Sequence, residues 1–290
     1  MKQNTKVSIL AFLTVFLWAS AFPLTKVAMT YYTPNALGFI RCTIAAVFLL
    51  IIGKANHIRP PQKKDLPWFF LSGCLGFTLY MITFNIGIQT LTSATASIII
   101  ATTPIMTAVV ASIFFREKIN RLGWFTILLA FFGVLILLLW EGMFSVNIGL
   151  IWTLCAATVF CGYNFLNRKL SSVGYTALEI VTYSMCCGAI LLAIFAPQGV
   201  VQLITAQPKY LLLVIYLGAF PSAMAYFFWG KALSLADKTN DVTNFMFVTP
   251  LLSTVMGFML LNEIPNMGTF IGGIIIIVSI ILFNLKGKEA

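Results

Sequence analysis

Apolar residues fill this chain in long runs that short polar loops separate. Reading for runs of roughly 17 or more mostly apolar residues predicts ten helices, each long enough to cross a bilayer. The predicted spans are residues 8–29, 36–53, 67–89, 93–115, 122–140, 147–167, 176–196, 208–231, 239–260 and 267–285. Because little of the chain lies outside these spans, the pattern indicates an all-α integral membrane protein with ten transmembrane helices.

One polar pattern occurs twice inside these runs. A Thr-Pro pair is followed by a glutamate thirteen residues after the proline, first at Pro104 and Glu117 and again at Pro250 and Glu263. The two prolines are 146 residues apart in a chain of 290 residues. The chain therefore divides into two related halves, residues 1–141 with helices 1–5 and residues 142–290 with helices 6–10.

The repeated prolines predict helix breaks near the middle of a span. Proline has no N–H, so the carbonyls of Ile100 and Met246 lose the helical partner that they would otherwise have. In lipid such a carbonyl must find another partner in a neighbouring helix, a side chain or water. Interrupted helices at matching positions of two halves, here at Pro104 and Pro250, are typical of a binding site between those halves. Simple packing kinks are the alternative interpretation.

Basic residues predict the orientation of the chain. Only Lys209 falls on the outer side if the N-terminus is cytoplasmic, and Lys26 and Arg41 lie within spans. The other fifteen of the eighteen basic residues then fall on the cytoplasmic side: Lys2, Lys6, Lys54, Arg59, Lys63, Lys64, Arg116, Lys118, Arg121, Arg168, Lys169, Lys231, Lys238, Lys286 and Lys288. By the positive-inside rule, we expect both termini to be cytoplasmic.

An odd number of helices in each half has a consequence for topology. The second group of five helices must enter the membrane upside down relative to the first, which predicts a 5+5 inverted-topology repeat. Helices 1 and 6 carry a further trace of the repeat, because FLWASAF followed by Lys26 resembles VFCGYNF followed by Lys169. Inverted repeats are typical of secondary transporters, whose substrate binds near the midplane between the repeats.

Composition supports a membrane protein and excludes several other classes. The chain is 60% hydrophobic and 9% charged, with a mean hydropathy of +0.98, whereas about a quarter of a soluble domain is charged. The placement of the basic residues beside the membrane explains their excess, so we expect no nucleic-acid partner. The six cysteines lie in apolar runs without zinc-ligand spacing, and the only histidine, His57, lies in a loop. We therefore expect no metal and no cofactor.

The ordered set of motifs resembles the drug/metabolite transporter superfamily, specifically its EamA-type ten-helix branch. The matching segments are FLWASAFPLTKVA, LGFIRCTIAAVFLL and SIFFREKI in the first half, and YLGAFPSAMAYFFWGKAL and MLLNEIP in the second. The resemblance covers essentially the whole chain. It implies a multi-pass carrier of the bacterial inner (plasma) membrane, often an exporter of amino acids or related metabolites, that alternates access around a central cavity. Cys161 stands where helix 6 matches the tryptophan of helix 1, so the two cavity walls are not equivalent.

Charged side chains within or beside the spans are candidates for gates. A charge in the membrane is costly, so these groups should pair with each other or face water. We predict an outer ionic cluster of Lys26, Arg41 and Glu263, and an inner one of Glu117 and Lys169, that open alternately. The alternative interpretation is that these residues only cap helix ends and set the topology.

Polar and aromatic residues near mid-span are the predicted substrate contacts. Hydroxyls and amides can hold the ends of a zwitterion, and aromatic faces suit an apolar or cationic group. We expect about half of the candidates to line the cavity, because Tyr and Trp also populate interfacial belts and Thr often bonds to its own helix. The candidates are Trp18, Ser20, Tyr80, Asn85, Thr102, Thr103, Tyr163, Asn164, Tyr226, Trp229, Asn244 and Thr249.

Together these features predict alternating-access transport of a small metabolite, most often the export of an amino acid or a related compound. No Asp or Glu is predicted at mid-span, which favours facilitated transport or exchange over proton coupling. A drug or cation exporter and a lipid flippase are alternatives. A membrane-embedded enzyme is disfavoured because it would need a concentrated set of titratable residues. Gly268-x-x-x-Gly272 could serve dimerisation, but packing within the bundle is favoured, and we expect a monomer or a weak homodimer.

Overall fold

The computed structural model describes residues 3–114, 119–140, 147–235, 242 and 244–286. All regular elements of this part of the chain are helical, and no strand occurs in it. Glu117 lies outside the described residues, as do the side chains of Pro104 and Asn244. The all-helical class expected from the apolar runs is therefore confirmed.

The first part of the chain forms helices that are in places joined end to end. Its elements are α1 (Gln3–Ala28), α2 (Pro34–Ala55), η1 (Lys63–Asp65), α3 (Leu66–Gly73), η2 (Cys74–Leu79), α4 (Tyr80–Ile88), α5 (Ser93–Ile100), α6 (Thr103–Phe114) and α7 (Arg121–Leu139). The second part has a similar order. Its elements are α8 (Ile148–Ser172), α9 (Ala177–Leu192), η3 (Ala193–Phe195), α10 (Ala196–Ile204), α11 (Pro208–Ala219), η4 (Phe220–Met224), α12 (Ala225–Leu235), η5 (Asn244–Phe247), α14 (Val248–Leu261) and α15 (Met267–Lys286).

Several helices are apolar enough to cross a bilayer. Six segments have the required length, namely Thr5–Ala28, Pro34–Ala55, Lys63–Ile88, Ile148–Ser172, Ala177–Ile204 and Pro208–Ala232. Four shorter apolar helices are Ser93–Thr107, Arg121–Leu137, Val248–Leu261 and Met267–Phe283. Each of the ten predicted spans overlaps one of these segments. The seventh prediction was too short, because η3 and α10 continue α9 to Ile204.

Local sequence explains where several helices begin. The side chains of Thr92, Asn120 and Asn147 accept hydrogen bonds from backbone N–H groups in the first turns of α5, α7 and α8. Thr176 and Glu179 form a capping box at the start of α9, each side chain bonding the backbone of the other residue. These caps satisfy N–H groups that a helix cannot satisfy itself, and so they set the boundaries of the elements.

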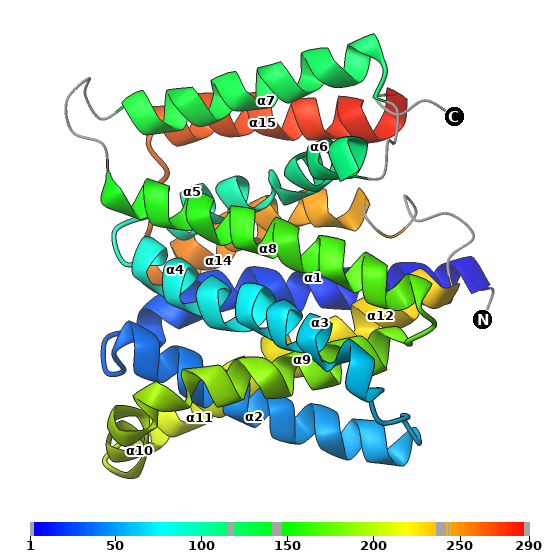
Figure 1. Ribbon diagram of the computed structural model, residues 1–290. Coiled ribbons are helices and arrows are strands. Elements are labelled where there is room, and N and C mark those ends of the chain that lie inside the picture. Colours follow the sequence, from blue (N-terminus) through cyan, green and yellow to red (C-terminus); the bar gives the residue numbers. More distant parts are fainter. Residues whose placement is uncertain (1–2, 115–118, 141–146, 236–241, 243, 287–290) are drawn as a thin grey trace.

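Helix α1 runs through the middle of the bundle and holds its parts together (Figure 1). It packs against α12 and α14, while α2 packs against α9 and α4 against α8. Figure 1 also shows that α7 and α15 lie side by side as a pair at one edge of the molecule. The start of α1 and the end of α15 lie at the same end of the bundle.

Glycines let the paired helices approach closely. A Cβ on Gly272 of α15 would lie 2.8 Å from the carbonyl oxygen of Gly133 on α7, and one on Gly268 would collide with Trp140. The Gly268-x-x-x-Gly272 motif therefore packs α15 against α7 within the same chain. This is the small-residue packing that lets membrane helices gain van der Waals contact.

The helix break beside Pro104 keeps its carbonyls satisfied. Helix α5 ends at Ile100 and α6 begins at Thr103, so the chain turns just before the proline. The hydroxyl of Thr103 donates to the carbonyl of Ile100 at 2.6 Å. Pro250, in contrast, is buried in the first turn of α14, where a helix needs no N–H from it. At Pro104, the Thr103 hydroxyl therefore replaces the N–H that the proline lacks.

Two π-helical segments interrupt the long helices, and the sequence analysis did not anticipate them. One is η2, which joins α3 to α4, and the other is η4, which joins α11 to α12. Their first residues, Cys74 and Phe220, are 146 residues apart, which equals the separation of Pro104 and Pro250. Short π-helical insertions in α-helices are frequent at functional sites.

We predict that Gly149→Ala destabilises the protein by about 1–3 kcal/mol because the new methyl overpacks the contact between α8 and α4. The added Cβ would lie 2.6 Å from the carbonyl oxygen of Gly87, which belongs to a helix backbone and cannot move alone. Gly162→Ala on the same helix is the matched control, since its Cβ would meet only the end of the flexible Leu75 side chain at 2.9 Å. Thermal unfolding in detergent should show a clear loss for the first variant and little for the second; equal losses would contradict the close packing.

Candidate functional site

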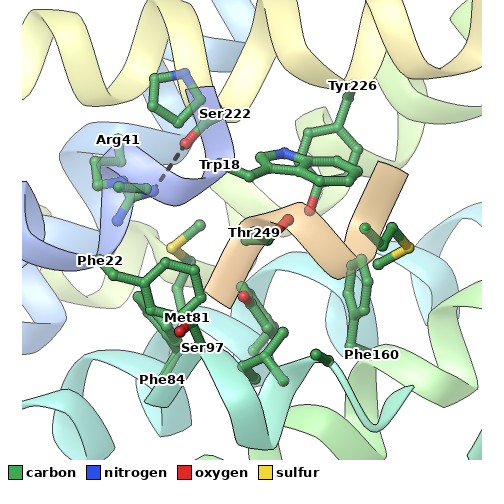
Figure 2. Close-up of a pocket in the computed structure, with 16 residues that line it drawn as sticks. Trp18, Phe22, Arg41, Met81, Phe84, Ser97, Phe160, Ser222, Tyr226 and Thr249 are labelled. Carbon is green, nitrogen blue, oxygen red and sulfur yellow. Dashed lines mark hydrogen bonds between the residues drawn. The ribbon is translucent and has the colours of Figure 1, made fainter. Parts of the chain in front are cut away.

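A central cavity lies among α1, α2, α4, α5, α8, α12 and α14. It has about 690 Å³ of empty space, a volume that includes the part open to the surroundings. Its lining residues come from both parts of the chain: Trp18, Ala21, Phe22, Arg41, Tyr80, Met81, Phe84, Ser97, Ile100, Ala101, Phe160, Pro221, Ser222, Tyr226, Met246 and Thr249. Figure 2 shows Arg41 on one side of this space and Phe160 and Tyr226 on the other. The cavity is therefore a mostly apolar site with a few polar groups, which is the usual composition of a small-molecule pocket.

Irregular backbone surrounds the cavity. Ser222 and Pro221 belong to the π-helix η4, and Ile100 and Ala101 lie where α5 ends. On the opposite wall, Tyr80 directly follows the π-helix η2. In a membrane, irregular backbone is tolerated where it is buried in protein or lines a cavity. The helix interruptions thus converge on one site.

Aromatic rings form two walls of the cavity. Trp18 meets Tyr226 edge to face, with ring centroids 5.4 Å apart, and its other neighbour Trp229 lies at 5.2 Å. Tyr80 stacks on Phe84 at 5.5 Å. These distances are in the range where aromatic pairs stabilise each other beyond simple burial. The rings therefore offer rigid, flat surfaces to an apolar group.

Arg41 is the charged residue of the cavity wall. Its side chain is buried, and its guanidinium donates to the hydroxyl of Thr25 at 2.9 Å and to that of Ser222 at 3.2 Å. The Nε atom of Arg41 is buried and has no hydrogen-bond partner among the described residues. We predicted that Arg41 clusters with Lys26 and Glu263. In the structure its guanidinium bonds Thr25 on α1 and Ser222 in η4, and neither ion pair of the described residues includes it.

Lys26 and Glu263 form an ion pair that joins α1 to the end of α14. The Glu263 carboxylate also accepts a hydrogen bond from the backbone N–H of Ser93 at 2.6 Å, and Lys26 donates to the carbonyl of Leu91 at 2.7 Å. Ser93 begins α5, so the carboxylate sits at a helix N-terminus, where a negative charge is favoured. The contact therefore fastens three helices at one point.

Two backbone features allow Glu263 to reach this position. Asn262 adopts a left-handed conformation with φ 53°, which ends α14 and turns the chain back. Gly257 leaves room for the carboxylate, since a Cβ there would lie 2.8 Å from the Oε2 atom of Glu263. The sequence at the end of α14 is thus suited to bring the glutamate against α5.

Four of the twelve predicted substrate contacts line the central cavity, namely Trp18, Tyr80, Tyr226 and Thr249. Thr249 has a further property, because its hydroxyl is buried and has no partner in the described part of the chain. Trp229 packs against the cavity residue Trp18, with the two rings tilted by 49°, without lining the space itself. These residues come from four helices, α1, α4, α12 and α14, and only the tertiary structure brings them together.

The other predicted contacts are used elsewhere in the structure. Ser20 bonds the hydroxyl of Tyr216, Asn85 donates to the carbonyl of Pro34, and Asn164 donates weakly to Thr107. Tyr163 is buried among Phe77, Phe160 and Tyr226, and Thr103 bonds the end of α5. Each of these side chains already has a structural role outside the central cavity.

A second cavity lies between α3, α6, α7 and α8 and has about 1750 Å³ of empty space. Thr102 lines it together with Cys161 and a set of apolar side chains that includes Trp68 and Phe131. The Thr102 hydroxyl donates to the carbonyl of Ile99 at 2.6 Å, so it is already satisfied. This cavity has no charged lining residue and therefore resembles the lipid-facing surface more than a polar binding site.

The predicted inner cluster is only partly visible. The ammonium of Lys169 lies over the ring of Trp68, 3.0 Å from its centroid, and is held by a cation–π contact. Glu117, its predicted partner, lies outside the described residues. The only other ion pair among the described residues joins Arg59 to Glu179 beside the cap of α9.

The sequence analysis missed most of the apolar cavity wall. Phe22, Phe84 and Phe160 carry no polar group that would distinguish them from the many phenylalanines that face lipid or the core. Ser222 did carry a signal, since it follows Pro221 in the middle of an apolar run, as Thr103 precedes Pro104. A small hydroxyl residue beside a mid-span proline therefore marked both interrupted helices.

Comparison with known proteins gives a consistent result. The model of the EamA-like transporter family matches twice, over residues 5–139 and 147–285. The chain is 29% identical to the uncharacterized transporter YdfC of Bacillus subtilis over 98% of this chain and 93% of the relative. It is 30% identical to a probable terminal-alkyne amino-acid exporter of Streptantibioticus cattleyicolor over 94% of this chain and 92% of the relative. It is also 29% identical to an S-adenosylmethionine/S-adenosylhomocysteine transporter of Chlamydia trachomatis over 88% of this chain and 81% of the relative.

A solved crystal structure shares the fold. It superposes with a TM-score of 0.66 and covers 95% of this chain and 97% of its own, at 16% sequence identity.

We predict that Thr249→Val leaves the stability unchanged or raises it, because it keeps the shape and removes a buried hydroxyl that has no partner among the described residues. Thr103→Val is the matched comparison: it removes the donor to the carbonyl of Ile100 and should cost about 1–3 kcal/mol. Thermal unfolding of the two purified variants in the same detergent checks this. A loss at Thr249 as large as the loss at Thr103 would mean that the Thr249 hydroxyl is already bonded.

Proposed function

The chain belongs to the EamA-like transporter family, and on that premise we propose that it carries a small metabolite across the membrane by alternating access. Family membership and the apolar helices make it a multi-pass membrane protein, consistent with the bacterial inner membrane. The observation that carries the proposal is the central cavity, because its wall is built from both matched segments of the chain. A site between two halves is what a carrier needs in order to face each side in turn.

The proposed substrate is an amino acid or a related metabolite, and the proposed direction is export. Support comes from the relative named as a probable terminal-alkyne amino-acid exporter and from the one named as an S-adenosylmethionine/S-adenosylhomocysteine transporter. The cavity agrees with a small molecule that has an apolar part, since aromatic rings form much of its wall. Within this site, Trp18, Tyr80, Tyr226 and Thr249 are the proposed substrate contacts.

We propose that the two halves, residues 1–141 and 142–290, are inverted repeats with both termini in the cytoplasm. Two features separated by 146 residues support this, the proline pair at Pro104 and Pro250 and the π-helices that begin at Cys74 and Phe220. The double match of the family model and the asymmetry of the basic residues agree with it. In this topology the four shorter apolar helices also cross the membrane.

The ion pair of Lys26 and Glu263 is the proposed outer gate. In the inverted topology it lies on the outer side, where it fastens α1 and α14 to the start of α5. Opening of the outer side then requires that this contact breaks. No carboxylate is among the residues that line the central cavity, which supports facilitated transport or exchange.

Membrane topology can be tested with single cysteines in a variant that lacks the six native ones. We predict that Thr30→Cys, at an exposed position in the loop after α1, reacts with a membrane-impermeant maleimide added to intact cells, and that Asn56→Cys, exposed after α2, reacts only in lysed cells. The opposite pattern would reverse the proposed orientation.

The gate can be tested by transport assays. We predict that Glu263→Gln changes the rate of transport in proteoliposomes by about tenfold, since a neutral amide loses the ion pair but keeps the size of the side chain. The amount inserted in the membrane should not change. The double variant Lys26→Glu and Glu263→Lys should recover part of the wild-type rate, because it restores opposite charges. Wild-type transport by Glu263→Gln would exclude the gate.

The function itself is tested by counterflow of labelled amino acids and other small metabolites into proteoliposomes. We predict saturable uptake of one class of compound, and a loss of about tenfold or more in Trp18→Ala because that ring forms the cavity wall. Trp124→Ala is the control, since that tryptophan is exposed on the surface of α7. Equal effects of the two substitutions would exclude Trp18 as a substrate contact, and the absence of flux for every compound would count against the proposed function.

A further inference from the structure

The central cavity contains a buried positive charge that no negative charge compensates within the described part of the chain. Arg41 is 3% exposed, and neither of the two ion pairs in that part of the chain includes it. Its partners, Thr25 and Ser222, are neutral hydroxyls. A charge at membrane depth is costly unless an opposite charge or water compensates it, so an unpaired one inside a cavity marks a functional site.

The guanidinium also has hydrogen-bonding capacity to spare. It carries five N–H donors in a planar fork. Thr25 and Ser222 accept one bond each, at the two terminal nitrogens, while the buried Nε of Arg41 has no partner. Figure 2 shows the bond to Ser222 and the position of Arg41 at the edge of the cavity. The two hydroxyls hold the guanidinium in place and leave part of the fork for a ligand.

A second polar atom of the cavity is also unsatisfied. The hydroxyl of Thr249, on α14, is buried without a hydrogen-bond partner among the residues that the structure describes. Figure 2 shows Thr249 among the residues that line the cavity. Most of the lining is apolar and includes Trp18 and Phe22 of α1. Seven other buried side-chain atoms of the described residues also lack a partner, but none of them belongs to a residue that lines this cavity. Buried polar atoms are usually bonded, and these two are the ones beside a space that a ligand can enter.

From this arrangement we infer that Arg41 binds a carboxylate of the transported substrate and that Thr249 binds a second polar group of the same molecule. The inference rests on the proposed function and deepens it by naming the substrate class. A carboxylate fits because it is planar, accepts two hydrogen bonds from a guanidinium and carries the single negative charge that the site lacks. The apolar part of the substrate lies against the rings of Trp18 and Phe22.

The same charge determines what the carrier rejects. An organic cation without a carboxylate would bring a second positive charge beside Arg41 in a site of low dielectric constant, where repulsion is strong. The substrate class is therefore an apolar molecule with a carboxylate, either a zwitterion or an anion, and not a simple cation. Thr25 and Ser222 act through Arg41 as positioning residues.

The test uses three pairs of compounds that differ only in the carboxylate. These are phenylalanine and phenethylamine, leucine and 3-methylbutylamine, and methionine and 3-(methylthio)propylamine. Thermal unfolding of the purified full-length protein in detergent measures binding, and counterflow in proteoliposomes measures transport. We expect at least one amino acid to raise the unfolding temperature, and its amine to do so only at a concentration at least tenfold higher.

Variants of Arg41 identify the group responsible. Arg41→Gln should weaken amino-acid binding at least tenfold and remove the preference for the acid over the amine. Arg41→Lys keeps the charge without the planar fork and should retain the preference with weaker binding. It also provides the test if the glutamine variant does not fold. Arg121→Gln, at the exposed start of α7, is the control and should bind as the wild type does.

The outcomes separate the two proposals. Equal binding of an amine and its amino acid, wild-type binding by both Arg41 variants, or no binding by any of the three amino acids would overturn the role of Arg41. Binding of an amino acid that depends on Arg41 without any flux would support the carboxylate site and count against the proposed transport function. Flux of amines alone would keep the transporter and reject the substrate class.

Discussion

Every polar group that the bilayer surrounds must find a partner within the protein, and this constraint governs the structure. An unpaired backbone carbonyl or a lone charge in hydrocarbon costs several kcal/mol. The chain meets the demand at the end of α5, where the hydroxyl of Thr103 bonds the carbonyl of Ile100. The chain meets the same demand at Glu263, whose carboxylate pairs with Lys26 and accepts a hydrogen bond from the N–H of Ser93. Interrupted helices are therefore stable in this protein only where a nearby group replaces the lost bond.

The same constraint gives meaning to the atoms that remain unpaired. Nine buried side-chain atoms of the described residues have no hydrogen-bond partner, and the Nε of Arg41 and the hydroxyl of Thr249 are among them. Both belong to the wall of the central cavity. A binding site needs such groups, because a ligand gains most from donors and acceptors that the protein itself leaves unused and that are already dehydrated. The wall of the cavity is thus polar at Arg41 and Thr249 and apolar over most of the remaining surface.

Close packing and irregular helices divide the molecule into different regions. Glycines bring α7 and α15 together within van der Waals contact, as Gly133 and Gly272 show, and α4 and α8 meet in the same way. Around the cavity, by contrast, π-helical segments and a helix break interrupt the regular packing. Tightly packed pairs of helices move as units, whereas interrupted helices have local bends about which such units can turn. This division fits a carrier that changes the side to which its cavity opens.

The sequence by itself determined the class of the protein, the approximate positions of its helices and several of the residues that matter. Length of apolar run and the position of proline are local properties, and helices in lipid form from local hydrogen bonds. Trp18, Tyr80, Tyr226 and Thr249, which line the central cavity, were candidates from sequence because side chains with a polar group are uncommon within the apolar runs. The resemblance of the motifs to a transporter family likewise needed no coordinates.

Only the tertiary structure decided which of these side chains meet. Arg41 and Ser222 are 181 positions apart in sequence, and Lys26 and Glu263 are 237 apart. Arg41 was grouped with Lys26 and Glu263 because all three lie near the outer ends of their helices, but only the structure shows that its guanidinium bonds Thr25 and Ser222 and lines the cavity. Ser20 and Asn85 were good candidates by type but bond Tyr216 and Pro34. The face that a helix presents depends on how its side chains pack against distant helices, and apolar runs without a clear polar stripe leave that rotation undetermined.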